Sequence, residues 1–138
     1  MRINTSTDYA VRMLLCLAKE SKPMSSSKLA AIIGVSSRYL LQISAKLRDA
    51  GLIVTTHGPA GGVYLCRNAG EINLYDVISV MEGRIGSISV LGRQDEPAEF
   101  KILNTAYEFV NTVLVGILKN ITIESLLAQS IESWNPAP

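Results

Sequence analysis

The apolar positions at the start of the chain recur every three or four residues, which is the spacing of one face of a helix. They are Tyr9, Ala10, Met13, Leu14, Leu17 and Ala18. We expect a helix from Thr5 to about Glu20, with Thr5 as its N-cap and Asp8 as an acidic residue in its first turn. The sequence Lys22-Pro23 interrupts the pattern and predicts the end of this element.

Two further helical patterns follow with almost no separation. The first runs from about Ser26 to Ile33, and Gly34 after it is suited to the left-handed conformation that ends a helix. Ser36 is positioned as the N-cap of the next helix, which Gly51 closes. Two short helices joined by a glycine turn are typical of a helix-turn-helix, whose second helix enters the DNA major groove.

The third helix has two different faces. At 100° per residue, Leu40, Ile43 and Leu47 fall on one side, which predicts that this side packs on the earlier helices. The opposite side carries Arg38, Gln42, Ala45 and Asp49. A guanidinium and a carboxamide one turn apart are suited to purine edges, and the flanking Lys46 and Arg48 to phosphates. Any amphipathic surface helix can show such a face, so the helix alone does not settle the matter.

A β-hairpin is predicted directly after this helix. Residues 52–56 and 63–66 read as two strands, and the turn between them is rich in glycine and proline. A phosphate-binding loop is excluded because neither a Lys-Ser or Lys-Thr pair nor a helix follows the glycines. A hairpin in this place is a wing, which lies beside the recognition helix and reaches the backbone or minor groove.

The remainder of the chain predicts three helices. Asn73 caps a helix from Leu74 to Glu82, and residues 83–96 look like a loop. Pro97 fits the first turn of a long helix that ends near Lys119. Thr122 caps a last short helix, and residues 134–138 look like a tail.

The long helix carries more apolar surface than one small domain needs. One seam, with alternating spacings of four and three, consists of Leu103, Tyr107, Val110, Leu114, Ile117 and Ile121. A second strip consists of Phe100, Ala106, Phe109 and Val113. We expect one strip to cover the chain's own core and the other to meet a second copy in a two-fold homodimer. The alternative is a wide amphipathic helix buried within a monomer.

Composition bounds the class of protein. A chain of 138 residues with 48% apolar content is expected to form one compact unit. Its longest uncharged apolar run, 113–118, is far shorter than the roughly 18 residues of a membrane span, and no signal-peptide pattern precedes it, so we expect a cytoplasmic protein without a membrane partner. The two cysteines, Cys16 and Cys66, are too few for a disulfide framework or a metal knuckle and are expected to be reduced and buried.

Charge divides the chain more sharply than its net value of +1 suggests. Residues 1–67 contain nine Lys and Arg and three acidic residues, 9 − 3 = +6. Residues 68–138 contain four basic and nine acidic residues, 4 − 9 = −5. This asymmetry indicates a polyanion partner for the first part only.

Taken in order, these segments resemble the Rrf2 family of regulators across nearly the whole chain. The resemblance rests on 1–5, 9–12, 35–40 with Gln42, 46–52, 58–62, 72–74, 76–78, 81–83 and 121–123. It implies a homodimer with winged-helix DNA binding and repression or activation of nearby genes, and of these two we expect repression. The implied DNA-binding residues are Arg2, Ser36, Ser37, Arg38, Tyr39, Leu41, Gln42, Lys46, His57, Gly58 and Gly61.

The chain departs from the family pattern at several positions. Many relatives hold an iron–sulfur cluster with three cysteines before the long helix, but residues 83–99 contain neither Cys nor His. We therefore expect no cofactor and no metal. His57 stands where relatives have a wing arginine, and Val63 where they have an aromatic residue. Leu41 replaces a polar base reader, and either faces a thymine methyl or packs on the wing.

The sequence thus predicts a mainly α protein with a small β-hairpin, in which a winged helix-turn-helix is followed by a long dimerisation helix. Residues 1–83 form the DNA-binding region and 84–138 the loop, dimerisation helix and C-terminal helix. An enzyme is disfavoured because the only histidine, His57, has no catalytic partners in sequence. The remaining rival is a protein-interaction module that keeps the winged helix but binds DNA weakly. Sensing by a thiol, with Cys16 as candidate, by a small ligand or by a partner protein stays open.

Overall fold

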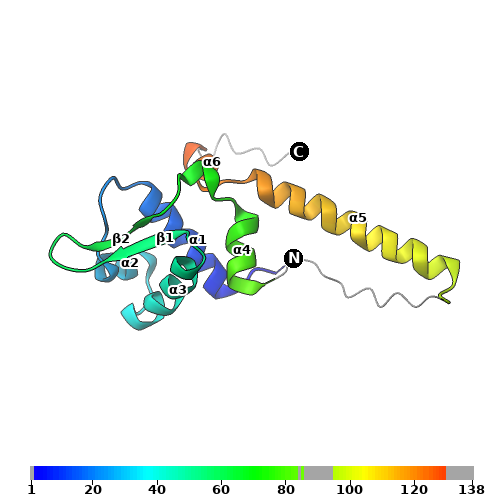
Figure 1. The fold of residues 1–138 in the computed structure, drawn as a ribbon, viewed down its shortest axis with the longest axis horizontal. Coiled ribbons are helices and arrows are strands. Elements are labelled where there is room, and N and C mark those ends of the chain that lie inside the picture. The colour runs from blue at the N-terminus through cyan, green and yellow to red at the C-terminus, as the bar shows by residue number, and fades with distance from the viewer. Residues whose placement is uncertain (1, 84, 86–94, 130–138) are drawn as a thin grey trace.

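The computed structural model describes residues 2–83, 85 and 95–129. Most of them are helical, and the two strands form one antiparallel hairpin (Figure 1). The predicted fold class, mainly α with a small hairpin, is confirmed. The elements are α1 (Thr5–Ala18), α2 (Ser26–Ile33), α3 (Ser37–Asp49), β1 (Ile53–Thr56), β2 (Gly62–Leu65), the 3-10 helix η1 (Ala69–Glu71), α4 (Leu74–Glu82), α5 (Ala98–Asn120) and α6 (Ile123–Ala128).

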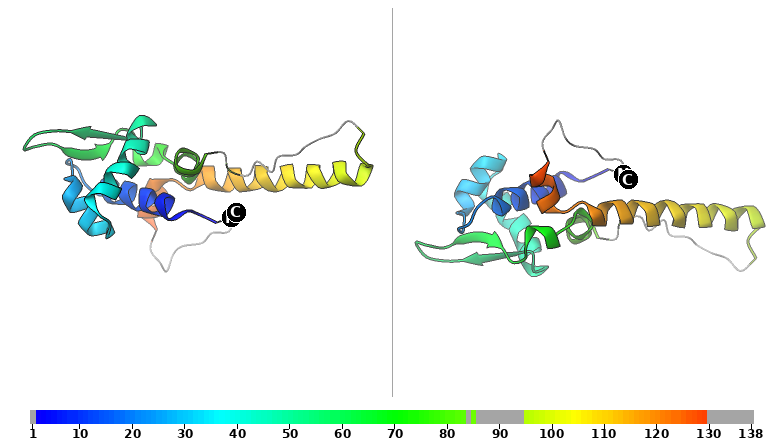
Figure 2. Two further views of the ribbon diagram at one scale, coloured as in Figure 1. Left: turned by 90° about the horizontal axis from the view of Figure 1, so that it is seen from below. Right: turned by 90° about the horizontal axis from the view of Figure 1, so that it is seen from above.

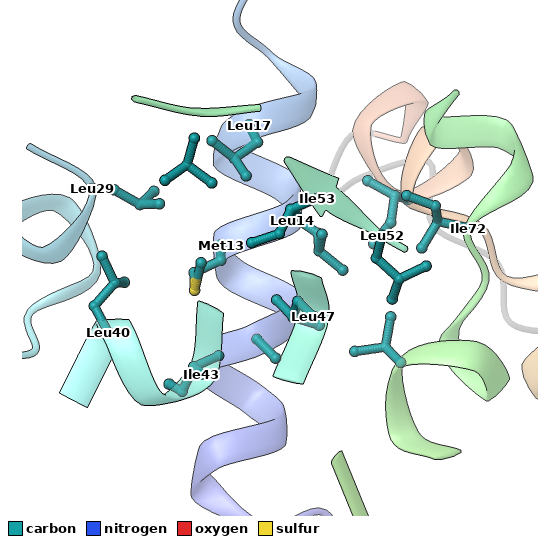
Figure 3. Close-up of a cluster of buried hydrophobic side chains, with 14 of the residues drawn as sticks. Met13, Leu14, Leu17, Leu29, Leu40, Ile43, Leu47, Leu52, Ile53 and Ile72 are labelled. Carbon is teal, nitrogen blue, oxygen red and sulfur yellow. The ribbon is translucent and has the colours of Figure 1, made fainter. Parts of the chain in front are cut away.

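Helix α1 runs through the centre of the folded body (Figure 3). Its residues Ala10, Met13 and Leu14 are completely buried. Helices α2, α3, α4 and α6 and strand β2 all contact it. Other residues of the same core are Leu29, Leu40, Ile43, Leu47, Leu52, Ile53, Val63, Ile72, Val77 and Ile123. A single core around one helix therefore fixes the relative positions of the helix-turn-helix and the hairpin.

Local capping residues set most of the helix ends as predicted. The Ser36 hydroxyl accepts a hydrogen bond from the Tyr39 N–H at 3.1 Å, and Gly34 takes the left-handed conformation at φ +83°. Asn73 and Asp76 form a reciprocal capping box at the start of α4. These bonds satisfy backbone donors that helix ends would otherwise leave unpaired.

Two predicted helix starts were wrong in detail. Asn4, not Thr5, is the N-cap of α1, and its side chain makes no capping bond. The Asp8 carboxylate is instead engaged by Arg12, whose Nε lies 2.7 Å away. Pro97 is the N-cap of α5 rather than a residue of its first turn. The structure describes only residues 83, 85, 95 and 96 of the loop predicted for 83–96. The predicted tail 134–138 lies outside the described residues.

A short bridge fastens the hairpin to the turn before α2. Met24 and Val63 exchange two backbone hydrogen bonds of 2.9 and 2.8 Å. At Gly62, with φ +154°, a Cβ would stand 2.6 Å from the Met24 carbonyl oxygen, so the close approach requires glycine. The outer edge of β2 is thereby paired at Val63.

Helix α5 projects away from the body instead of lying along it (Figures 1 and 2). Leu118, near its C-terminal end, is its only buried residue, and its contacts are mainly with α4. The expectation that one apolar strip covers the chain's own core was therefore wrong for most of the helix. Periodicity defined the apolar positions but not where the helix axis points. No helix in the described ranges is long and apolar enough to cross a membrane.

Helix α6 returns to the body after α5. Backbone hydrogen bonds of 2.9 Å from Leu74 to Ile121 and 2.8 Å from Ile123 to Ile72 join it to the start of α4. Lys119 Nζ lies 4.9 Å from the centre of the Tyr75 ring, a cation–π contact that ties the end of α5 to α4. The root of α5 is thus held firmly against the winged-helix body.

Replacing Asn73 by alanine is expected to lower the free energy of unfolding by about 1 kcal/mol, because the N-cap bond of α4 is lost. Chemical denaturation at a fixed protein concentration measures the change. Asn4→Ala is the matched control, since Asn4 is an N-cap without a side-chain bond. Equal losses in the two variants would show that the capping box does not stabilise the protein.

Candidate nucleic-acid interface

Helix α3 is buried on one side and open on the other. Leu40, Ile43 and Leu47 are at most 2% exposed, as the periodicity predicted. Ser44 is buried beside them, and no described residue forms a hydrogen bond with its hydroxyl. The amphipathic pattern therefore anchors the helix and leaves its opposite side free.

The outer side of α3 presents polar and apolar groups together. Arg38, Gln42 and Lys46 are exposed, and the small Ala45 lies between them along the helix. Leu41 is 58% exposed, which disagrees with packing on the hairpin, because a residue packed there would be covered; its contact with a thymine methyl stays a prediction. This outer face carries hydrogen-bond donors, an amide and a methyl-bearing side chain, the groups that base edges in the major groove recognise.

The start of α3 is held against α1 by two tyrosines. The rings of Tyr39 and Tyr9 meet edge to face, with centroids 5.9 Å apart and planes at 86°. Tyr39 is consequently half-buried, whereas Ser36 and Ser37 before it are exposed. Tyr9 was predicted only as an apolar residue of α1. Its role in positioning α3 depends on its contact with Tyr39, which is 30 positions away in the sequence. A local sequence pattern cannot reveal such a contact.

Two of the four basic residues on α1 and α3 have acidic neighbours. Arg12 is paired with Asp8, and the hydrogen bond to that carboxylate, together with its charge, raises the pKa of the Arg12 guanidinium. Arg48 Nε lies 3.6 Å from the Asp49 carboxylate. Arg38 and Lys46 form no ion pair with any residue that the structure describes. The unpaired cations of α3 therefore lie on its outer face.

The hairpin turn beside α3 offers little charge. His57 and Gly58 are exposed and Gly61 is half-buried. The sequence from Ile53 to Cys66 contains neither Lys nor Arg. At Gly61 a Cβ would stand 2.6 Å from the Thr56 carbonyl oxygen, so this glycine is required by the tightness of the turn itself.

The structure brings together only part of the predicted set. The α3 residues share one surface, and α3 contacts β1 directly. Arg2 is exposed, but the segment before α1 runs away from α3 (Figure 1). Its predicted DNA contact stays a prediction.

The two cysteines are free and occupy different environments. Cys16 on α1 is half-buried, so its predicted redox role stays a prediction. The expectation of a buried Cys66 was wrong, because its thiol is exposed at the end of β2. Its backbone N–H continues the hairpin by bonding to Leu52, and the strand ends there.

The predicted dimerisation residues form an exposed strip along α5. Val110 is 63% exposed, and Leu103, Tyr107 and Ile117 lie between 37% and 46%, whereas Leu114 is half-buried. The second strip is equally open, with Phe100 at 55% and Phe109 at 68%. Contiguous exposed apolar surface of this kind marks an interaction site.

Comparison with known proteins identifies the relatives of this chain. A family model described as "Rrf2: Iron-dependent Transcriptional regulator" matches residues 3–129. Protein aau3 of Rhizobium meliloti is 36% identical over 131 residues, which cover 92% of this chain and 85% of the relative. The HTH-type transcriptional regulator IscR of Cronobacter sakazakii is 32% identical, covering 92% of this chain and 80% of its own.

Solved structures agree with these matches. CymR, the global cysteine regulator of B. subtilis, superposes with a TM-score of 0.75 at 29% identity, over 94% of this chain and 98% of its own. IscR of T. potens gives a TM-score of 0.77 at 28% identity, over 98% of this chain and 92% of its own.

The iron in the family description does not fit the donors of this chain. Iron–sulfur clusters are held mainly by several cysteine thiolates, and this sequence has only Cys16 and Cys66, on separate elements. Within the described ranges, no three His, Cys, Asp or Glu side chains are grouped so that they could hold a metal ion.

Proposed function

Because this chain belongs to the Rrf2 family of transcriptional regulators, we propose that it binds operator DNA as a homodimer through the outer face of α3. The observation that carries this proposal is the division of α3 into a buried side and an exposed side with unpaired Arg38 and Lys46. IscR and CymR, two of the relatives named above, are regulators, in agreement with the prediction that the chain is not an enzyme.

Each outer-face residue has a role that follows from its chemistry. Arg38 donates two hydrogen bonds to a guanine, Gln42 pairs with an adenine, and Leu41 contacts a thymine methyl. Lys46, Ser37 and Tyr39 bind phosphates and fix the register of the helix. His57, Gly58 and Gly61 bring the hairpin turn close to the DNA backbone.

The homodimer is proposed from the open strips of α5. Two copies related by a two-fold axis cover each other's exposed side chains with the same surface. Residues 1–83 then bind DNA and 84–138 mediate pairing, although α6 packs on α1 and η1 of the body. Two α3 helices per dimer match two half-sites of a palindromic operator.

Regulation is proposed to take place without an iron–sulfur cluster, since the thiolates for one are missing. Repression is the simplest outcome, because occupancy of a promoter is sufficient for it. The signal that changes occupancy is a thiol modification, a small ligand or a partner protein.

One observation favours a second function, a protein-interaction module that binds DNA weakly. The hairpin from Ile53 to Cys66 contains neither Lys nor Arg to contact the DNA backbone. Salt dependence separates the two functions, because phosphate contacts release counterions and protein contacts do not.

Binding to random duplex DNA is expected to weaken steeply with salt, with a slope of about −0.9 per phosphate contacted. Lys46→Ala is expected to reduce that slope by about one unit per protomer and to weaken binding to all sequences alike. Fluorescence anisotropy over a series of salt concentrations measures both. Lys19→Ala, which removes an exposed lysine at the end of α1, is the matched control. A flat salt dependence would favour the interaction module.

A further inference from the structure

An open groove of about 1200 Å³ crosses the body beside the base of the hairpin. Its walls come from the end of α1, the turn before α2, the end of β2, η1 and α6. In Figure 1 the turn after α1 and α6 lie above α1, whereas α3 lies below it. A molecule in this groove would therefore not cover the outer face of α3.

The floor of the groove includes an unpaired strand edge. Val63 directs its N–H and C=O to Met24 on the outer edge of β2, whereas Cys66 directs its N–H to Leu52 on the inner edge. Because successive residues of an antiparallel strand alternate between edges, Leu65 directs both backbone groups outward, as Val63 does. No backbone hydrogen bond joins Leu65 to a described residue on that side.

The segment before Met24 does not pair with this edge. If the antiparallel pairing of Met24 with Val63 continued, Lys22 would pair with Leu65. Pro23 interrupts the strand at that point, and the chain turns away toward α1. The bridge thus sets the register for a further strand, and no segment among residues 2–83, 85 and 95–129 occupies that place.

Charged side chains of both signs border the groove without pairing with one another. Lys22 lies in the turn before α2, close to Glu20, and Glu71 and Glu124 lie on η1 and α6. Arg67 also lines the groove, but its guanidinium points elsewhere, since a Cβ at Gly51 would stand 3.8 Å from one of its nitrogens. Glu124 lies so close to η1 that a Cβ at Gly70 would collide with its carboxylate. The described residues form only two ion pairs, neither of them in the groove. These charges are available to an outside partner.

We propose that this groove binds an extended peptide of a partner protein, which adds a strand to β2 at Leu65. The backbone of the peptide exchanges two hydrogen bonds with Leu65, and this is the mode of binding known as β-augmentation. An acidic side chain of the peptide meets Lys22, and a basic one meets Glu71 or Glu124. Because β2 belongs to the wing and α6 follows α5, such a peptide contacts both proposed functional regions.

The test uses the full-length chain without DNA, so its outcome does not depend on operator binding. A display library of random nine-residue peptides is selected on the immobilised protein, and an enriched peptide is synthesised. Its affinity is expected to fall about tenfold or more in Lys22→Glu and to stay within about twofold in Lys19→Glu, the same charge reversal outside the groove. Methylating the peptide nitrogen that faces Leu65 is expected to cost about tenfold, because a backbone hydrogen bond is lost.

Hydrogen exchange supplies the structural readout. The Leu65 amide is expected to exchange more slowly with the peptide bound, while amides of α3 are unchanged. The proposal is overturned if no peptide is enriched over a blank surface, or if enriched peptides bind Lys22→Glu with wild-type affinity. Protection of Leu65 by millimolar free glutamate or lysine, without any peptide enrichment, would assign the groove to a small ligand instead.

Discussion

Replacing Val110 by aspartate is expected to convert the protein to a monomer and to weaken operator binding about a hundredfold or more. Val110 is 63% exposed on α5 and is not part of the hydrophobic core, so the substitution leaves that core unchanged. In a dimer it would place a carboxylate in an apolar interface, where an unpaired charge is costly. Operator affinity falls because a dimer binds both half-sites through two linked α3 helices, whereas two monomers must bind them independently.

Two measurements on the same protein check this result. Analytical ultracentrifugation gives the oligomeric state, and gel shift on a palindromic operator gives the affinity. Thr112→Asp is the matched control, since Thr112 is exposed two residues later and about 200° around the helix, on its polar side. A Val110→Asp protein that stays dimeric would exclude this strip as the interface. A monomer with full operator affinity would exclude the coupling between pairing and DNA binding.

Substituting Arg38 with alanine is expected to remove about 1–3 kcal/mol of discrimination between the operator and random DNA. Arg38 is exposed and without an ionic partner among the described residues, so its guanidinium is available to a base edge. The affinity for random duplex DNA is expected to fall only by the small amount that follows from the loss of one positive charge per protomer.

Two control substitutions separate charge from base recognition. Arg38→Lys keeps the charge but loses the planar guanidinium that can donate two parallel hydrogen bonds. It is expected to retain its affinity for random duplex DNA and to lose most of the discrimination between operator and random DNA. Arg48→Ala removes an arginine that lies beside Asp49, and it is expected to leave discrimination intact. Equal losses on operator and random DNA for Arg38→Ala would show that this residue contacts phosphate alone.

The proposed peptide groove and the outer face of α3 lie on different sides of α1 (Figure 1), so the peptide and the operator would not compete for one surface. The peptide groove is bordered by β2 and α6, and α6 is joined by backbone hydrogen bonds to the start of α4. A partner bound there would reach the wing through β2 and the dimer through α5. This arrangement favours a partner protein over Cys16 as the source of regulation, because Cys16 is half-buried in α1.

Local chemistry in the sequence determined most of the secondary structure. Ser36 and Asn73 were predicted as N-caps and Gly34 as a left-handed helix end because each acts on backbone groups within a few residues. The two faces of α3 followed from helical periodicity, which depends only on the rotation per residue. The buried face around Leu40 and the exposed residues opposite therefore follow from the order of the amino acids alone.

Features that join distant parts of the chain were decided by the tertiary structure alone. The exposure of both strips of α5 depends on the direction of that helix from the body, which is set by contacts of α4, Lys119 and α6 at its root. The open edge at Leu65 depends on the bridge between Met24 and Val63, 39 positions apart. Periodicity tells which residues share a face, but only the packing of the whole chain tells what, if anything, covers that face.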